Sequence, residues 1–244
     1  MRNVIVTGGS RGLGLGISRK LAGAGYRVIA IARKENNELL AAIEEANQVN
    51  PGSFHFTPFD LGVIDEIPNL VKMLRKEHGA IYGLVNNAGI SFDGSLSLMP
   101  TSQIEQLLRV NTLSPIVLTK YVVRSMMADG GGRVVSLSSI TAFAGYSGLA
   151  VYSASKASLL GFSRSLAREV GRMGVNVNVV APGFVETEMT HSIKDEQRQQ
   201  IERRSALKRL ADVEDIANAV EYLLSDKAKN ITGTVLTVDA GSTA

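Results

Sequence analysis

The 244 residues suffice for one sizeable hydrophobic core and contain no linker-like stretch, so we predict a single domain over residues 1–244. With 45% hydrophobic and 20% charged residues, the composition excludes a disordered chain. The net charge of +3 is spread along the sequence. The one basic cluster, residues 198–209, is interrupted by Glu202, which favours a solvated helix face over a nucleic-acid site.

The chain has no cysteine, which excludes disulfides, a thiol nucleophile and thiolate metal ligands. Its three histidines, His55, His78 and His191, are far apart in the sequence, so we expect no metal site. No segment approaches the ~18 consecutive apolar residues of a membrane span, and the first apolar stretch is too short for a signal peptide. We therefore expect a cytoplasmic protein.

Short β-rich runs alternate with segments of helical periodicity along the chain. The runs predicted as strands are residues 3–7, 27–32, 53–59, 80–86, 133–138, 175–181 and 234–238, with helical segments between them. This alternation predicts an α/β fold, a doubly wound parallel seven-stranded sheet of the Rossmann type with helices on both faces. Ligands of such sheets bind beyond the carboxyl ends of the strands, so the loops that follow the strands form the candidate site.

The loop after the first predicted strand reads TGGSRGLG, residues 7–14. Gly8, Gly12 and Gly14 permit a tight turn and a close approach of backbone amides and a helix N-terminus to a diphosphate. The spacing differs from the general dinucleotide fingerprint G-x-G-x-x-G, and a plain strand-to-helix turn is the alternative. The pattern favours a dinucleotide site.

The end of the second predicted strand indicates which dinucleotide binds. An NAD enzyme places a carboxylate there for the ribose 2′-hydroxyl, whereas this chain has Ala32, Arg33 and Lys34. Arg33, with Arg11 from the glycine loop, would instead pair with the 2′-phosphate of NADP(H). The alternative is that both arginines only face solvent.

Tyr152 precedes Lys156 by one helical turn in the segment VYSASKASLLGF, residues 151–162. Residues four apart share a helix face, so the phenol and the ammonium lie close together. A neutral phenol gains little from an ammonium in water, and the pair makes chemical sense if the phenol exchanges a proton. The spacing alone is weak evidence and needs other motifs beside it.

Taken together, the motifs resemble the short-chain dehydrogenase/reductase family over almost the whole chain. The stretches that match are TGGSRGLG (7–14), NNAG (86–89), Asn111, Ser139, Tyr152 with Lys156, and APGFVETEM (181–189). They occur in the family's order and are specific as a set, although each is weak alone.

Carried over by position, the resemblance makes Tyr152 the group that exchanges a proton with the substrate oxygen, and Ser139 a hydrogen-bond partner of that oxygen. Lys156 would hold the nicotinamide ribose and lower the pKa of Tyr152 from its usual value of about 10. Asn111 would hold a relay water through its main-chain carbonyl, which Pro115 leaves without a helical amide donor. A simple bend of the helix is the alternative explanation of Pro115.

The resemblance also implies the contacts with NADP(H). Asp60 and Leu61 would flank the adenine, with a turn role as the alternative for Asp60, and Val185 and Thr187 would hold the carboxamide. A polar segment near residues 187–209 would be a mobile substrate lid. The full cofactor set is Gly8, Ser10, Arg11, Gly12, Leu13, Gly14, Arg33, Asp60, Leu61, Asn87, Ala88, Gly89, Tyr152, Lys156, Pro182, Gly183, Val185 and Thr187.

Within the family, residues 151–170 and 177–190 are most similar to the 3-oxoacyl-[acyl-carrier-protein] reductases. This likeness implies NADPH-dependent reduction of a 3-oxoacyl thioester in fatty acid biosynthesis, by a homotetramer. Two positions where such enzymes commonly present arginines to an acidic carrier protein are Gly130 and Met173 here, so coenzyme A thioesters stay open as substrates. Ala240 before Gly241 also departs from the usual pair of glycines, at what would be the tetramer edge.

Two alternatives remain from the sequence. One is a dehydrogenase of another secondary alcohol, sugar or hydroxy acid on the same fold. The other is a dinucleotide-sensing regulator without turnover, which the complete set of Asn111, Ser139, Tyr152 and Lys156 argues against.

Overall fold

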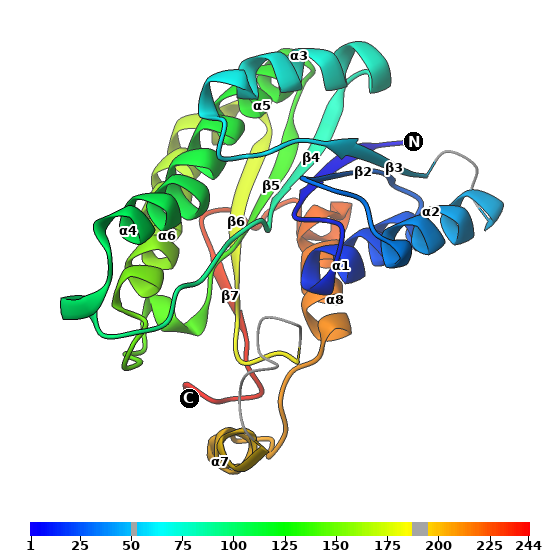
Figure 1. The fold of residues 1–244 in the computed structure, drawn as a ribbon. Coiled ribbons are helices and arrows are strands. Elements are labelled where there is room, and N and C mark those ends of the chain that lie inside the picture. The colour runs from blue at the N-terminus through cyan, green and yellow to red at the C-terminus, as the bar shows by residue number, and fades with distance from the viewer. Residues whose placement is uncertain (50–52, 187–194) are drawn as a thin grey trace.

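Seven short β-rich runs form one parallel sheet in the order β3-β2-β1-β4-β5-β6-β7 (Figure 1). The computed structural model describes residues 1–49, 53–186 and 195–244. The strands are β1 (Asn3–Thr7), β2 (Arg27–Ala32), β3 (Phe54–Pro58), β4 (Ile81–Asn86), β5 (Gly132–Leu137), β6 (Val175–Pro182) and β7 (Val235–Val238). The helices are α1 (Gly12–Gly23), α2 (Asn37–Val49), α3 (Ile67–His78), α4 (Thr101–Leu108), α5 (Ser114–Ala128), α6 (Ala150–Val170), α7 (Asp195–Arg204) and α8 (Val213–Leu224).

The sheet is buried on both faces, which explains why its strands read as continuous apolar runs. Alternate residues of β1 enter opposite cores: Val4 and Val6 pack in the core with α1, α2 and α8, whereas Ile5 packs in the core with α3, α5 and α6. The predicted fold class is confirmed, and no strand boundary differs from its prediction by more than one residue. Within the described residues, no helix is both long and apolar enough to cross a membrane.

The order of the strands reverses between β1 and β4. The chain runs outward from β1 through β2 to β3, then returns to place β4 on the other side of β1. The loops after β1 and β4 therefore diverge to opposite faces and leave a crevice at the carboxyl edge of the sheet, where such folds bind dinucleotides. Thr7 ends β1 and Asn86 ends β4, so both motif loops open at this crevice.

The long helical segment around Asn111 is divided by a π-helical turn, Arg109–Leu113, between α4 and α5. Pro115 has no amide hydrogen, and its ring disfavours the ordinary helical geometry of the preceding turn. The amide of Ser114 instead donates to the carbonyl of Arg109, five residues back. The kink predicted at Pro115 is thus present as a π turn, and Pro115, four residues after Asn111, has no amide hydrogen to donate to the carbonyl of Asn111.

The rings of His55 and His78 lie 5.1 Å apart between their centroids, although the two residues are distant in the sequence. His55 is in β3, and His78 ends α3 with a side chain only 6% exposed. Burial lowers the pKa of His78, Glu77 raises it, and His55 and Arg27 lower it further. Among the described residues, no group of three or more potential ligands could hold a metal ion.

The His78 pair makes stability depend on pH. The folded pKa of His78 is below its unfolded value of about 6.5, so its neutral form stabilises the fold above that pH and this contribution is lost as the pH falls below it. We expect the free energy of unfolding in urea to decrease from pH 7.5 to pH 5 less in His78→Gln than in the wild type. Equal decreases in both proteins would show that His78 does not titrate as its burial implies.

Ala240 has a φ of +54°, a left-handed conformation that is costly for a residue with a Cβ atom. We expect Ala240→Gly to raise the free energy of unfolding by about 1 kcal/mol, because glycine adopts this φ without strain. The matched control is Ala41→Gly in the exposed middle of α2, where glycine should destabilise by about 1 kcal/mol. Urea unfolding of both variants tests whether the two changes in the free energy of unfolding have opposite signs. Changes of the same sign would contradict backbone strain at Ala240.

Candidate active site

The glycine loop turns tightly at the end of β1. Gly8 has a φ of +66°, and its amide donates to the carbonyl of Ile31 at 2.7 Å. A Cβ atom added at Gly14 would lie 2.1 Å from the carbonyl oxygen of Gly8, so only glycine allows α1 to start this close to the turn. The loop therefore brings the amino end of α1 to the crevice, as the sequence predicts for a diphosphate site.

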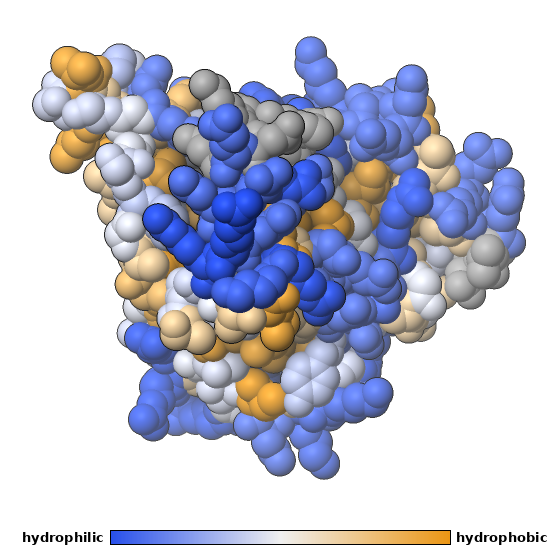
Figure 2. All heavy atoms as spheres, turned by 90° about the horizontal axis from the view of Figure 1, so that it is seen from below, coloured by the Kyte–Doolittle hydropathy of each residue, from blue (hydrophilic) through white to orange (hydrophobic). Residues whose placement is uncertain are grey.

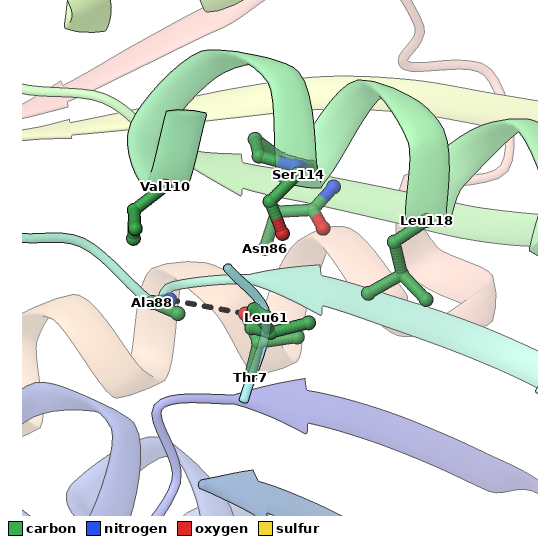
Figure 3. A pocket seen from close by; sticks show the side chains of 8 residues that line it. Thr7, Leu61, Asn86, Ala88, Val110, Ser114 and Leu118 are labelled. Atoms are coloured by element: carbon green, nitrogen blue, oxygen red, sulfur yellow. Dashed lines mark hydrogen bonds between the residues drawn. The ribbon is translucent and has the colours of Figure 1, made fainter. Parts of the chain in front are cut away.

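Thr7 joins the glycine loop to the loop after β4 (Figure 3). Its Oγ1 accepts hydrogen bonds from the amides of Asn87 at 2.9 Å and Ala88 at 3.0 Å. The side chain of Asn87 in turn donates to the carbonyl of Thr7 at 2.9 Å. Thr7 begins the glycine motif but was not among the expected contact residues; its role here is to hold two predicted binding loops in a fixed relation.

A small cavity of about 10 Å³ lies beside this junction (Figure 3). Leu61 and Ala88, both predicted to contact the adenosine, line it together with residues of β1, β4 and α5. Asp60 is exposed, and its carboxylate accepts from the amide of Gly62 at 2.8 Å. Asp60 thus has the local turn contact that the sequence analysis considered as its alternative role.

Arg11 and Arg33 lie on two loops that Asn36 ties together. The side chain of Asn36 donates to the carbonyl of Ser10 at 3.0 Å and accepts from the amide of Leu39 at 2.8 Å. Arg11 precedes α1, Arg33 follows β2, and both side chains are exposed. Asn36 was missed by the sequence analysis because a capping asparagine gives no sign of its second, long-range contact.

Asn111 is buried in the π turn and fixes the loop that follows β4. Its side chain accepts from the amide of Ile90 at 2.8 Å and donates to the carbonyl of the same residue at 2.8 Å. It also donates to Ser155 Oγ at 3.2 Å, and Ser155 donates to the carbonyl of Tyr152 at 2.7 Å. Two of the predicted catalytic residues, Asn111 and Tyr152, are thus connected through one buried serine of α6.

Lys156 is 5% exposed and connects α6 to β5. Its Nζ donates to the carbonyl of Leu137 at 2.9 Å and lies 5.8 Å from the centre of the Tyr152 ring. A Cβ atom added at Gly89 would lie 3.3 Å from both Lys156 Nζ and Asn111 Oδ1. The loop after β4, the π turn and α6 therefore meet at one point, with predicted site residues from each.

Ser139 follows β5 and caps the short helical turn Ile140–Ala142, its Oγ accepting from the amide of Thr141 at 3.2 Å. Tyr152 lies in the first turn of α6 and is hydrogen-bonded to Ser139. The strand end and the helix start bring the two hydroxyl groups together, which is the arrangement that the motif order implies for a shared substrate oxygen.

The pKa of Tyr152 differs from the expectation. Burial raises it to about 12; the hydrogen bond from Ser139 acts in the opposite direction, and Asp93 raises it further. Burial also lowers the pKa of Lys156 to about 8. The Tyr152 pKa is therefore raised, contrary to the lowering expected from Lys156, because loss of hydration destabilises the phenolate more than its neighbours stabilise it. At neutral pH the phenol holds its proton and the lysine is mostly charged.

The loop after β6 supplies the last predicted contacts. Pro182 ends β6, Gly183 packs against Asp239, and Val185 pairs with Ala211 in an isolated parallel bridge. Thr187 and the rest of the predicted lid up to residue 194 lie outside the described residues. The described part of the lid region contains α7, which Arg198 links to Glu186 by an ion pair of 2.7 Å.

Comparisons with known proteins agree with this arrangement. Residues 8–243 match the family model described as Enoyl-(Acyl carrier protein) reductase, a short-chain dehydrogenase/reductase model. The chain is 40% identical over 237 residues to the 3-oxoacyl-[acyl-carrier-protein] reductase FabG of Escherichia coli, covering 97% of this chain and 95% of that protein.

Two solved structures are also similar. One is a blue fluorescent protein from a metagenomic library in complex with NADPH, with a TM-score of 0.92 and 31% identity over 100% of this chain and 98% of the other. The second is a gluconate 5-dehydrogenase from Burkholderia cenocepacia in complex with NADP and tartrate, with a TM-score of 0.93 and 26% identity over 99% and 95% of the two chains.

Proposed function

Because the chain belongs to the short-chain dehydrogenase/reductase family, whose members are oxidoreductases, we propose that it reduces a 3-oxoacyl thioester to the 3-hydroxyacyl thioester with NADPH. The observation that carries this proposal is the meeting of Ser139, Tyr152 and Lys156 at one end of the sheet, with Tyr152 protonated at neutral pH. Reduction of a ketone needs a proton donor beside the oxygen, and a protonated Tyr152 is one. The 40% identity to a 3-oxoacyl-[acyl-carrier-protein] reductase over nearly the whole chain supports the substrate class.

The residues at the crevice fit a dinucleotide phosphate. The turn at Gly8 and Gly14 has no room for a Cβ atom and exposes backbone amides at the start of α1, and Arg11 and Arg33 offer guanidinium groups on adjoining loops. When bound, NADPH supplies the hydride that adds to the carbonyl carbon. Lys156 would hold the nicotinamide ribose, and Leu61 and Ala88 would contact the adenosine.

The protein's own residues would supply the proton and hold the oxygen. Ser139 would donate a hydrogen bond to the ketone oxygen, and Tyr152 Oη would transfer its proton to that oxygen as the C–O double bond becomes single. The charged Lys156 would stabilise the phenolate that this step leaves. A proton from solvent would then return to Tyr152 through the relay water that the main-chain carbonyl of Asn111 would hold. The product is a secondary alcohol, and each proton delivered is replaced from water.

Aromatic side chains near the catalytic loops favour an apolar acyl group. Phe143, four residues after Ser139, is 50% exposed. The rings of Tyr146 and Phe184, from the loops after β5 and β6, contact edge to face with centroids 5.6 Å apart. A polyhydroxylated acid such as gluconate would gain less from this surface than an acyl chain does. The structural similarity to a gluconate 5-dehydrogenase nevertheless makes gluconate the second candidate substrate.

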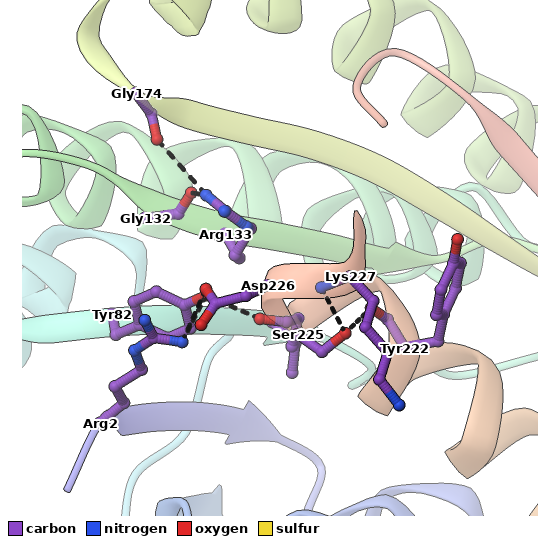
Figure 4. Close-up of polar contacts among 10 residues, drawn as sticks. Arg2, Tyr82, Gly132, Arg133, Gly174, Tyr222, Ser225, Asp226 and Lys227 are labelled. Atoms are coloured by element: carbon purple, nitrogen blue, oxygen red, sulfur yellow. Dashed lines mark hydrogen bonds and ion pairs between the residues drawn. The ribbon is translucent and has the colours of Figure 1, made fainter. Parts of the chain in front are cut away.

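Arg133 does not replace the arginines expected for carrier-protein docking (Figure 4). Its Nη1 donates to the carbonyl of Gly132 at 3.0 Å, and its guanidinium lies 5.8 Å from the centre of the Tyr82 ring. Arg2 covers the same ring at 4.4 Å and pairs with Asp226. Arg133 therefore belongs to a surface cluster with Arg2, Tyr82 and Asp226 at the amino end of the sheet, and we propose coenzyme A thioesters as substrates alongside carrier-protein thioesters.

The proposed assembly is a homotetramer paired through the region of α4, α5 and α6. Leu108 and Leu113, at the two sides of the π turn, are 39% and 42% exposed in the single chain. Apolar side chains of this size are commonly covered in an assembly. The tetramer stays a prediction, which the molar mass in solution by light scattering would test.

The first experiment is the rate of NADPH oxidation with acetoacetyl-coenzyme A, with NADH in a parallel reaction and gluconate with NADP⁺ as the competing substrate. We expect rapid turnover of the thioester with NADPH. Turnover of gluconate without turnover of the thioester would replace the proposal with the dehydrogenase alternative. Binding of NADPH without turnover of either would favour a dinucleotide-sensing protein.

A further inference from the structure

The C-terminal turn after β7 is organised by one carboxylate, that of Asp239, which is only 9% exposed. It accepts hydrogen bonds from the amide of Gly241 at 2.9 Å, the amide of Thr243 at 2.9 Å and the hydroxyl of Thr243 at 2.7 Å. The carbonyl of Asp239 also accepts from the amide and hydroxyl of Ser242. A buried carboxylate with this number of donors holds its turn in one conformation.

The same turn holds the residues that follow α7. The carbonyl of Gly241 accepts from the amide of Ala206 at 3.2 Å, and the carbonyl of Ala240 accepts from the amide of Leu207 at 3.1 Å. Ser205, just before them, is fully buried. Figure 1 shows the C-terminus beside the lower end of β7 and near α7, and Figure 2 shows the hydrophilic surface of α7 at the centre of this face.

Asp239 also touches the loop predicted to hold the nicotinamide. A Cβ atom added at Gly183 would lie 2.6 Å from the Cβ of Asp239, so the two backbones are in direct contact. The charge of Asp239 raises the pKa of Tyr146 after the larger effect of burial, and Arg204 of α7 lowers it, so both charges act on the loop that holds Tyr146. Asp239 thus contacts the loop after β6 directly, and it reaches the residues that follow α7 through the C-terminal turn that its carboxylate orders.

We propose that Asp239 is a positioning residue, which fixes the end of α7 relative to the loop at Gly183 through the turn that its carboxylate orders. It touches neither the reacting atoms nor the catalytic tyrosine. Its effect is on how firmly α7 is held beside the substrate, so it should appear in KM more than in kcat. The kinetic part rests on the proposed function, whereas the anchoring of α7 does not.

The test compares Asp239→Asn with Asp226→Asn, a matched change of an exposed carboxylate at the opposite end of the sheet (Figure 4). In Asp239→Asn an amide group meets the donors of Thr243, and the turn should open. Trypsin cleaves after exposed Arg203, Arg204 and Lys208, which flank the anchored residues. We expect cleavage there to be about 10-fold faster in Asp239→Asn than in the wild type or Asp226→Asn, with native protein and saturating NADPH.

In steady-state assays, we expect Asp239→Asn to raise the KM for acetoacetyl-coenzyme A about fivefold, with kcat and the Kd of NADPH within twofold of the wild type. Wild-type rates of cleavage in Asp239→Asn would overturn the proposal, even if the substrate proves to be another ketone. Faster cleavage in Asp239→Asn, together with a wild-type protein that is inactive toward every thioester, would still support the anchoring role of Asp239. It would overturn only the proposed substrate.

Should Asp239→Asn fail to fold, Thr243→Val removes the single hydroxyl donor and keeps the backbone contacts. We expect trypsin cleavage about two- to fivefold faster in this variant, because it loses one of the three hydrogen bonds to the carboxylate, the one from the Thr243 hydroxyl. A rate equal to that of the wild type would contradict the role of the turn.

Discussion

Tyr152→Phe is expected to reduce kcat for thioester reduction by about 10²–10⁴-fold while leaving the Kd of NADPH within twofold of the wild type. The substitution removes one hydroxyl and keeps the ring that packs beside Lys156. The burial that raises the pKa of Tyr152 to about 12 also keeps its proton in place at neutral pH, so the variant lacks the proton donor that the proposed reduction needs. Steady-state rates and a fluorescence titration with NADPH measure the two quantities.

The control for this variant is Tyr222→Phe on α8, where the tyrosine is 40% exposed. It should have wild-type activity. Near-normal turnover in Tyr152→Phe would remove Tyr152 from the mechanism and leave Ser139 as the remaining hydroxyl at the site. A large loss of NADPH affinity in the same variant would instead assign Tyr152 to cofactor binding.

Arg33→Asp is expected to lower the ratio of kcat/KM for NADPH to that for NADH by about 100-fold. A hydrogen bond between charged groups contributes about 1.5–3 kcal/mol, and an acidic side chain adds repulsion of the 2′-phosphate. The same carboxylate can accept from the ribose 2′-hydroxyl of NADH. Measuring kcat/KM with each dinucleotide at fixed ionic strength gives the ratio directly.

Arg168→Asp is the matched control, because it makes the same change of charge at an exposed position in the last turn of α6. It should preserve the preference for NADPH. An unchanged ratio in Arg33→Asp would mean that Arg33 faces solvent in the complex. A loss of activity with both dinucleotides would assign Arg33 a structural role in the loop between β2 and α2.

The fold and the position of Lys156 beside Tyr152 could be predicted from the sequence because both follow from local patterns. Strands buried on both faces have continuous apolar runs, and Tyr152 and Lys156 are one helical turn apart. Pro115 likewise predicts a break in its helix, although the choice of a π turn depends on how the helix packs. Each of these patterns can be read within a short stretch of the sequence.

The features that the sequence did not predict all depend on distant contacts. The contact of His55 with His78 is made by β3 and α3, and that of Asp239 with Gly183 by the loops after β7 and β6. The pKa of Tyr152 depends on how much water the folded site excludes, which no spacing of residues encodes. Contacts between side chains that are distant in the sequence could therefore be identified only from the structure.

The strand order has a consequence for how the chain folds during synthesis. The order β3-β2-β1-β4-β5-β6-β7 means that every new strand joins a strand already made, and from β4 onward each joins the same growing edge. Domains commonly fold from the N-terminus while the ribosome elongates the chain. A nascent chain that stalls after β6 and before α8 would leave β6 as an open edge and α1 without α8, so partial chains of this length are expected to aggregate.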